Sequence, residues 1–451
     1  MKGNSLALLI LLSFLTSCGK VIGEKNSAPR TPDQVGIIAS CTSKSEAQAI
    51  AQEFGVQYRV INEKRKLIEF IGLTQSELET LLPKSKFRSN KIYNDVLISG
   101  DFKSKSVANY EFYGAHPPTY RNESSGRYFP HLEQIKALQN KFLGEGITIA
   151  IIDTGVYYNH PHLSPNILLN GLDKHGSNAD NQDSDNNGFI DDYVGWDFYN
   201  GDAYPIDDNG HGTHVAGLAA STYMGIAPKA KILPVKVLSS DGRGDLGTIA
   251  AGIFYAIDRG ADIINLSLGG TAGSQVSAEL QTLINATRTA KSNNTLLVAA
   301  AGNGGNDGIG DCNDNLPVYP ANIQEENLIS VASVDAYNQI TEYSNFGGAT
   351  VHIAAPGGDV YTGGLYSVGI PSCFGPCSQD DIPYRSSMGT SMSTPIVAGL
   401  AAVIKSANKT TSPKKIRDII LKTGTKIPQL EGLLVSPSVI NVQMALKELL
   451  L

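Results

Sequence analysis

Hydrophobic and polar positions divide the chain into a short first part and a longer second part. In residues 35–101, short apolar runs that predict strands alternate with amphipathic stretches that predict helices. The first helix is indicated by Ala47, Ile50, Ala51 and Phe54, which repeat with the spacing of one helix face. The resulting order βαββαβ, within about 65 residues, is typical of a ferredoxin-like α+β unit.

From residue 131 onward, longer apolar runs alternate with helical patterns. The stretch GITIAIIDTGV (residues 146–156) is almost continuously apolar, which is typical of a strand buried on both faces of a parallel sheet. The stretches ADIINLSLGG and NTLLVAAAGNGG have the same form and run into glycines. Near the C-terminus, an Ala-, Val- and Leu-rich run predicts a buried helix that begins near Ser393. We therefore predict an α/β domain built on parallel strands.

The N-terminal segment predicts an exported lipoprotein. It has one Lys, an apolar run from Leu6 to Leu15 and then small residues, which is the layout of a secretory signal peptide. The run is too short to cross a bilayer as a mature helix. Its end, LTSC, resembles a bacterial lipobox, which implies cleavage before Cys18 and lipidation of that residue; an ordinary signal peptide is the alternative. Gly19 after this cysteine is compatible with sorting to the outer membrane of a Gram-negative bacterium.

Shifts in composition place five segments along the chain. The polar, Pro-containing residues after the signal have the composition of a tether, and a stretch rich in Pro, Tyr, Ser and Gly separates the two folded parts. We expect a lipoprotein signal peptide (1–17), a tether (18–34), the ferredoxin-like unit (35–101), a linker (102–130) and the α/β domain (131–451).

Composition and charge exclude two classes of protein. Hydrophobic residues make up 41% of the chain and charged residues 18%, with 46 glycines, which is ordinary for a turn-rich globular enzyme and excludes a disordered chain. The net charge of -7 and the lack of a basic run argue against nucleic acid as a partner.

The cysteines fit an extracytoplasmic compartment, where disulfides persist. Besides Cys18 they are Cys41, Cys312, Cys373 and Cys377. The last two have no further Cys or His at the spacing of a zinc site, so we do not expect zinc. We expect a loop disulfide, which joins either these two residues or Cys312 and one of them. Sequence alone does not fix the pairing.

Asp153 stands at the C-terminal end of the strand predicted over residues 146–156. In open α/β sheets, catalytic and ligand-binding groups gather beyond the carboxyl ends of the strands, which makes this carboxylate a candidate. Asn303 follows another predicted strand in the same way. The alternative for Asp153 is a turn cap with Thr154 and Gly155.

Two histidines, His211 and His214, lie three residues apart in DDNGHGTHVAG. They do not form a zinc motif of the H-E-x-x-H type, because Gly212 stands where that motif has its Glu. His211 lies at a glycine-rich corner between strand and helix, which suits a general base, whereas we expect His214 to be packed inside the helix.

Ser391 stands at the mouth of the predicted C-terminal helix, in GTSMSTP. A helix N-terminus has free N–H groups and a partial positive charge, which suits a site where negative charge develops. The stretch by itself leaves two interpretations open, a helix cap and a nucleophile.

Four separate motifs resemble those of the subtilisin-like serine proteases. They are IIDTGV with Asp153, HGTHVAG with His211, AAAGN with Asn303 and GTSMSTP with Ser391, in the chain order Asp, His, Ser of subtilisin. The resemblance runs from residue 131 to the C-terminus and includes GIAP, SLGG and APG. It implies a mostly parallel sheet with helices on both faces, and it implies that the first unit is an inhibitory propeptide.

The resemblance also implies a role for each of these residues. Ser391 attacks the scissile carbonyl, and His211 takes its proton and later gives it to the leaving amine. Asp153 orients His211, while the side-chain amide of Asn303 and the backbone N–H of Ser391 bind the oxyanion. The choice for Ser391 is thereby decided in favour of the nucleophile.

Substrate-binding residues follow from the same resemblance. Ser267, Leu268 and Gly269 correspond to an edge strand that pairs with an extended peptide through backbone hydrogen bonds. Ala301 and Gly302 wall the pocket for the residue before the cut. Unfolded segments and loops of polypeptides are the expected substrates, and we expect no organic cofactor.

The acidic stretch DNQDSDNNGFIDDYVGWDF predicts a structural calcium ion. Asp183, Asp185 and Asn187 alternate, a glycine permits the turn and Asp191 follows, which resembles the first part of an EF-hand calcium loop. Val194 replaces the bidentate Glu that ends such a loop, so this is not a true EF-hand. A solvated acidic loop is the alternative.

These observations predict an exported, lipid-anchored serine endopeptidase that works through an acyl-enzyme. It would be made as an autoprocessed zymogen, with its own propeptide as intramolecular inhibitor. The alternative is a catalytically silent surface binding protein with the same fold. Inactive relatives typically lack a member of the triad, and this chain retains all three residues.

Overall fold

The computed structural model of the chain divides into two units, residues 1–101 and 102–451. It describes residues 36–40, 57–62, 67–71, 92–94, 130–138, 141–174, 176, 179–271, 278–305, 307–371 and 384–450. The predicted signal peptide, the tether and most of the linker therefore lie outside the described residues.

The first unit contains a four-stranded antiparallel sheet. Its strands are β1 (Gly36–Ser40), β2 (Gln57–Asn62), β3 (Leu67–Ile71) and β4 (Ile92–Asn94), in the spatial order β2-β3-β1-β4. The helices predicted between these strands lie outside the described residues. The ferredoxin-like unit and its propeptide role therefore stay predictions.

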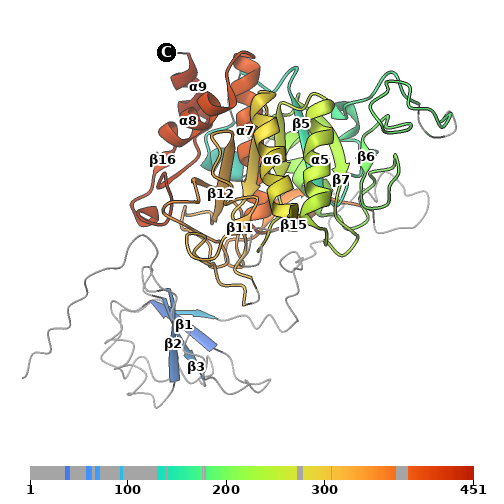
Figure 1. The fold of residues 1–451 in the computed structure, drawn as a ribbon. Coiled ribbons are helices and arrows are strands. Elements are labelled where there is room, and N and C mark those ends of the chain that lie inside the picture. Colours follow the sequence, from blue (N-terminus) through green and yellow to red (C-terminus); the bar gives the residue numbers. More distant parts are fainter. Residues whose placement is uncertain are drawn as a thin grey trace, which may run out of the picture. The chain divides into compact units, whose positions relative to one another are not determined.

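The second unit is built on a nine-stranded sheet (Figure 1). In spatial order its strands are β16 (Thr425–Lys426), β17 (Ser438–Val439), β13 (Ile353–Pro356), β12 (Leu328–Val334), β10 (Leu296–Ala300), β8 (Ile263–Leu266), β5 (Thr148–Asp153), β7 (Lys231–Lys236) and β6 (Trp196–Asp197). All neighbouring strands are parallel except β16 and β17 at one edge.

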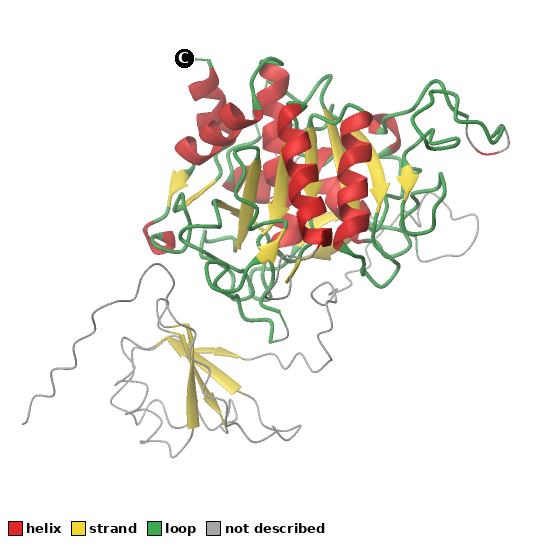
Figure 2. Ribbon diagram, in the orientation of Figure 1, coloured by secondary structure: helices red, strands yellow, loops and turns green. Residues whose placement is uncertain are grey.

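Helices cover both faces of this sheet, as Figure 2 shows in red. Helices α5 (Leu246–Asp258) and α6 (Ala278–Ser292) pack side by side on one face, and α4 (His211–Ala220) and α7 (Thr390–Ala407) pack together on the other. The mostly parallel sheet with helices on both faces is thus confirmed.

Shorter elements complete the second unit. They are α3 (Pro130–Gln134), α8 (Pro413–Thr423), α9 (Val442–Leu449) and two small antiparallel sheets, one of β9 (Gly270–Thr271) with β11 (Val318–Tyr319) and one of β14 (Leu365–Val368) with β15 (Tyr384–Ser387). Within the described part of the chain, no helix has the length and apolar character that a membrane span requires.

The apolar runs of the sequence become strands because the sheet is buried on both faces. Ile152, Val235 and Leu297 on the strands, with Ile253 and Leu283 on the covering helices, have no exposure to solvent. Each such side chain contributes about 1.5–3 kcal/mol relative to an exposed position. A strand covered on both faces has no polar side to alternate with, which explains the continuous apolar pattern.

The candidate catalytic residues lie at the carboxyl ends of the strands and the N-termini of two helices. Strand β5 ends at Asp153, and β10 ends three residues before Asn303. Helix α4 begins at His211. The topology therefore brings residues from distant parts of the sequence to one edge of the sheet.

Helix α7 begins at Thr390, so the start that the hydrophobic pattern predicts near Ser393 is three residues too late. The apolar run marks only the buried part of the helix, whereas the first turn is polar. Gly389 is the N-cap, and the side chain of Asn303 accepts the N–H of Thr390 at 2.9 Å. Ser391 is thus the second residue of the helix.

Candidate active site

Asp153 and His211 form the buried half of the site. Nδ1 of His211 lies 2.7 Å from Oδ1 of Asp153, whose side chain is fully buried, while the imidazole is 13% exposed. The same Oδ1 accepts the backbone N–H of Thr154 at 2.7 Å. Since Nδ1 of the neutral imidazole donates to the carboxylate, Nε2 is the nitrogen left to accept a proton.

The close approach of α4 to β5 requires a glycine at position 212. A Cβ at Gly212 would lie 2.1 Å from the carbonyl oxygen of Gly155 and 3.1 Å from Cβ of Asp153. The N–H of Gly212 instead donates to Oγ1 of Thr154 at 3.0 Å. Gly212 thereby allows α4 to lie against the end of β5.

A second buried carboxylate, that of Asp207, fixes the turn that leads into α4. Oδ1 accepts the N–H groups of Asn209 (3.0 Å) and Gly210 (2.8 Å) and the hydroxyl of Thr154 (2.9 Å). Oδ2 accepts the N–H of Thr213 at 2.8 Å. Burial raises the pKa of Asp207, and these hydrogen bonds oppose the rise. The carboxylate pairs N–H groups that have no acceptor within the helix.

Asp153 controls the charge of His211. Burial by itself lowers the pKa of the imidazole, but the negative charge of Asp153 and its hydrogen bond outweigh burial, and the pKa is raised above its ordinary value. The neighbouring His214 differs, since burial lowers its pKa to about 3. Its Nε2 donates to the carbonyl groups of Leu365 (3.0 Å) and Arg385 (3.1 Å). His214 is therefore a neutral, buried side chain that ties α4 to the hairpin of β14 and β15.

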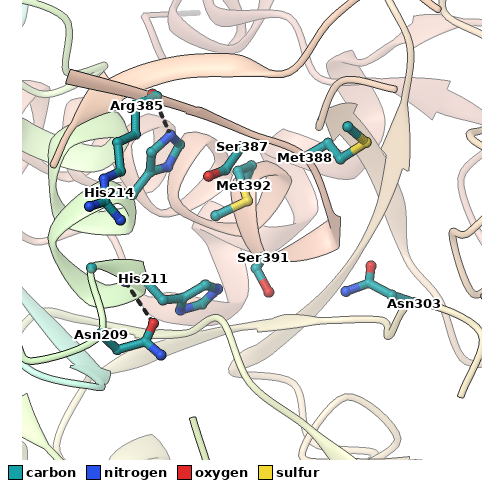
Figure 3. Close-up of a pocket in the computed structure, with 10 residues that line it drawn as sticks. Asn209, His211, His214, Asn303, Arg385, Ser387, Met388, Ser391 and Met392 are labelled. Carbon is teal, nitrogen blue, oxygen red and sulfur yellow. Dashed lines mark hydrogen bonds between the residues drawn. The ribbon is translucent and has the colours of Figure 1, made fainter. Parts of the chain in front are cut away.

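Ser391 faces the pocket between His211 and Asn303 (Figure 3). Its Oγ donates to the carbonyl of Ser267 at 3.1 Å, and Oγ of Ser267 donates to the carbonyl of Ser391 at 2.8 Å. If Ser391 acts as the nucleophile, its hydroxyl has to break the hydrogen bond to the carbonyl of Ser267 before its proton can pass to His211. Catalytic hydrogen bonds often form fully only when substrate is bound.

The orientation of the Asn303 side chain is fixed by Thr390. Oδ1 of Asn303 accepts both the N–H and the hydroxyl of Thr390, each at 2.9 Å. The Nδ2 group is thereby directed toward the pocket, on the side of Ser391 in Figure 3. The N–H of Ser391 belongs to the first turn of α7, where N–H groups have no acceptor within the helix. These two groups are the candidate donors of an oxyanion site.

The predicted substrate-binding residues lie around this pocket. Ser267, Leu268 and Gly269 connect β8 to the exposed strand β9, and Ser267 contacts Ser391 as described. Ala301 and Gly302 lie between β10 and Asn303, and the N–H of Gly302 donates to Oγ1 of Thr390 at 3.3 Å. A Cβ at Gly269 would lie 2.9 Å from Cγ1 of Val318.

The acidic loop brings three carboxylates together, but only one of them belongs to the predicted calcium set. Oxygen atoms of Asp173, Asp185 and Asp192 lie within 4.8 Å of one another. Burial raises the pKa of Asp173 to about 6, with a further contribution from Asp192. Asp185 belongs to the predicted set, whereas Asp173 and Asp192 follow no EF-hand spacing and were not predicted.

The other predicted calcium residues have different partners. Asp183 accepts the N–H of Gly188 at 2.8 Å, and Asp191 accepts the N–H of Asn181 at 2.8 Å. Nδ2 of Asn187 donates to Asp185 and to Asp192, each at 3.0 Å. Two of the predicted carboxylates thus hold turns of the loop.

Of the cysteines, Cys312 is disulfide-bonded. Cys18, Cys41, Cys373 and Cys377 lie outside the described residues, so the pairing stays open.

Comparison with known families decides the class of this site. The family model of the Subtilase family matches residues 144–435, which include all four motifs. The chain belongs to the subtilase family.

Relatives with known activity agree with this result. This subtilase is 36% identical to thermitase of Thermoactinomyces vulgaris over 310 residues, which cover 67% of this chain and 90% of thermitase. It is 31% identical to the thermophilic serine proteinase of Bacillus sp. (strain AK1) over 441 residues, which cover 94% of this chain and 93% of that protein.

Solved structures give the same fold. Proteases from Pseudoalteromonas arctica match with a TM-score of 0.54 and 28% identity, over 73% of this chain and 96% of theirs. A cold adapted subtilisin-like serine proteinase matches with a TM-score of 0.50 and 25% identity, over 67% of this chain and 90% of its own. The chain is a subtilisin-like serine protease, which confirms the family and the enzyme class that the motifs imply.

Three residues of this subtilase's site were not predicted from the sequence. Asp207 caps the start of α4, Thr390 orients Asn303, and Arg385 lines the pocket. Asp207 and Thr390 lie within the quoted motifs and their flanks, but only spatial contact shows their roles. Arg385 follows no pattern that marks it.

We expect kcat/KM to fall at acid pH with a midpoint above 6.5, because only neutral His211 accepts a proton and Asp153 raises its pKa. The conformational stability that this pair contributes has the opposite dependence. It is present below the unfolded pKa and decreases as the pH rises through the folded pKa.

Asp153→Asn should move this midpoint to lower pH and lower kcat about 10⁴-fold, by analogy with other triads. The pH dependence of hydrolysis of a chromogenic peptide measures both effects. An unchanged midpoint in the variant would show that Asp153 does not set the protonation of His211.

Proposed function

We propose that this subtilase is an active endopeptidase in which Asp153, His211 and Ser391 act as a triad. The 2.7 Å hydrogen bond between the buried Asp153 and Nδ1 of His211 carries the proposal. It prepares the imidazole to take a proton at Nε2 and stabilises the imidazolium that then forms. A buried carboxylate is costly unless it is paired. A fold retained only for binding would have no need of this buried pair.

In the proposed reaction, Oγ of Ser391 attacks the carbonyl carbon of the scissile bond while His211 takes its proton. The tetrahedral intermediate then collapses, the C–N bond breaks and His211 gives the proton to the leaving amine. The acyl group remains on Ser391 as an ester. Water that is deprotonated by His211 hydrolyses this ester and restores the serine hydroxyl.

Asn303 and the N-terminus of α7 would stabilise the intermediate. Because Oδ1 of Asn303 is occupied by Thr390, its Nδ2 is available to the oxyanion without rearrangement. The N–H of Ser391 supplies the second donor, and the dipole of α7 favours negative charge at the same point.

An extended peptide would bind along Ser267, Leu268 and Gly269 through backbone hydrogen bonds, with Ala301 and Gly302 beside the residue that precedes the cut. This arrangement reads the backbone of the substrate and favours unfolded segments. A silent binding protein is the second candidate, but no observation in the described part of the chain favours it.

The first unit would be the propeptide, and the linker 102–130 would contain the processing site. The match to the thermophilic serine proteinase supports this organisation, since it spans 94% of this chain and so includes part of the first unit. The propeptide would inhibit the protease until its own active site releases it.

Export and anchoring would follow from the N-terminal segment. Cleavage before Cys18 and lipidation of that residue would hold the protease on the extracytoplasmic side of a membrane, with outer-membrane sorting as the expected destination. Polypeptides in that compartment would be the substrates.

A structural calcium ion would bind at the acidic loop. Carboxylate oxygens are the ligands that calcium prefers, and Asp173, Asp185 and Asp192 provide three of them close together. The amide Nδ2 of Asn170 lies 2.7–3.0 Å from all three, at the place where positive charge is favourable. Asn187 contacts two of the same carboxylates, and Asp183 and Asp191 would hold the loop around the ion.

Ser391→Ala should abolish peptide hydrolysis and accumulate as a chain that still carries residues 35–101. The nucleophile that cuts peptides is also the one that removes the propeptide, and His211 cannot replace it. Expression of both forms in a host without other extracytoplasmic proteases, followed by intact-mass analysis, measures the difference. The wild-type chain should be cut within residues 102–130.

If Ser391→Ala is trimmed as fast as wild type, another protease performs the maturation or Ser391 is not the nucleophile. Purified wild-type enzyme added to the untrimmed variant separates these cases. The variant then serves as the substrate, and any trimming occurs between two molecules.

Cys18→Ser should move the protein from the membrane fraction to a soluble or unprocessed form, because lipidation requires the thiol. Membrane fractionation with and without detergent measures this. Cys41→Ser is the matched control and should stay with the membrane. A processed Cys18→Ser chain that still needs detergent for release would contradict the lipid anchor.

Calcium removal should lower the melting temperature, because a ligand that binds only the folded state stabilises it by about 2.7 kcal/mol at a hundredfold excess over its Kd. Melting curves of the Ser391→Ala protein, with EDTA or with calcium, avoid self-digestion. Asp185→Asn should remove most of the calcium dependence, and the exposed Asp258→Asn should not. Identical curves in both media, with no bound calcium by elemental analysis, would rule out the site.

A further inference from the structure

We propose that Arg385 is a specificity-determining residue that binds an acidic side chain on the leaving-group side of the scissile bond. This inference rests on the proposed function, since it assigns a substrate preference to the same pocket. It concerns a residue that takes no part in the triad or the oxyanion site.

Arg385 belongs to β15 and lines the pocket together with His211, Asn303 and Ser391 (Figure 3). Its guanidinium lies against the turn that precedes α4. A Cβ built on Gly210 would be 3.3 Å from Nη1 of Arg385. The cation therefore lies beside the residue that directly precedes His211.

The geometry of the reaction gives the side of the substrate that Arg385 faces. Ala301 and Gly302, directly before Asn303, wall the proposed pocket for the residue that precedes the cut, so the acyl part of the substrate lies at that end of the pocket. The amine leaves over His211, which gives it a proton. In Figure 3, Arg385 lies on the His211 side and away from Asn303. It is thus placed to meet the first or second residue after the cut.

The charge of Arg385 is not neutralised within the described part of the chain. No described carboxylate forms an ion pair with it, and its Nε is buried without a hydrogen-bond partner. Arg243, Arg259 and Arg288, by contrast, are paired with Asp241, Asp192 and Glu325. A partly buried cation without a partner costs free energy, and an arriving carboxylate would remove that cost.

Hydrogen bonds hold the backbone of Arg385 in place, and its side chain remains available to a substrate. Arg385 pairs with Ser367 in the β14–β15 ladder, and its carbonyl accepts Nε2 of His214 at 3.1 Å. The hydroxyl of Ser367 donates in turn to the carbonyl of His214 at 2.8 Å. Because His214 and His211 belong to the same helix, the backbone of Arg385 keeps a fixed place relative to the proposed catalytic base.

The expected ligand is therefore a carboxylate. A guanidinium offers planar N–H donors that match the two oxygens of Asp or Glu, and it repels Lys and Arg at the same place. Unfolded segments with an acidic residue at the first or second position after the cut would be the preferred substrates.

The test uses three internally quenched peptides that differ only in the first two residues after the cleaved bond. Both of these residues are Glu in one peptide, Gln in the second and Lys in the third. We expect the processed wild-type enzyme to prefer Glu to Lys by about tenfold or more in kcat/KM, the range of a charge-assisted hydrogen bond. Arg385→Gln should bring the ratio near one, Arg385→Glu should invert it and Arg385→Lys should keep part of it.

Arg288→Gln is the matched control, since it removes the same charge from an exposed guanidinium outside the pocket, and it should keep the wild-type ratio. An equal loss of activity toward all three peptides in Arg385→Gln, or an unchanged ratio, would overturn this inference alone. A wild-type chain that cleaves no peptide, like Ser391→Ala, would overturn the proposed function and this inference with it.

Discussion

The hydrogen bond between Asp153 and His211 is the constraint on which the rest of the second unit depends. It requires the end of a buried strand and the start of a helix to approach until Nδ1 of His211 lies 2.7 Å from Oδ1 of Asp153. Burial of a carboxylate is unfavourable, so the chain provides partners for it, with His211 and the N–H of Thr154 on the same oxygen. Gly212 makes the approach possible, because any side chain there would meet the backbone of Gly155.

Helices α4 and α7, which carry the candidate catalytic residues His211 and Ser391, begin in the same way. Both have a glycine as N-cap, Gly210 in α4 and Gly389 in α7, and neither cap supplies a side-chain hydrogen bond. Side chains outside the helices accept these first N–H groups instead, Asp207 for α4 and Asn303 for α7. In the second case the cap also has a chemical consequence, since an amide whose oxygen is held by the helix must turn its nitrogen to the pocket.

In the proposed function, the hairpin of β14 and β15 would join selection of substrate to catalysis. His214 lies one helical turn after His211 and donates to the carbonyl of Arg385, so the helix that carries the proposed base also holds the backbone of Arg385. The same pocket would thus combine a reaction site that recognises only the backbone of the substrate with one side chain that recognises charge.

The sequence by itself determined the parallel strands of the second unit, the family, and the four motifs that contain the candidate catalytic residues. Its parallel strands are continuous apolar runs because both faces are buried, and Asp153, His211, Asn303 and Ser391 lie in short motifs whose residues are neighbours in the chain. Only the tertiary structure decided which side chains meet across those motifs. The grouping of Asp185 with Asp173 and Asp192, the cap that Asp207 gives to α4, the start of α7 at Thr390 and the position of Arg385 all depend on contacts between distant segments. The hydrophobic pattern along the chain indicates which face of a helix or strand is buried. It does not indicate which other segment that face packs against.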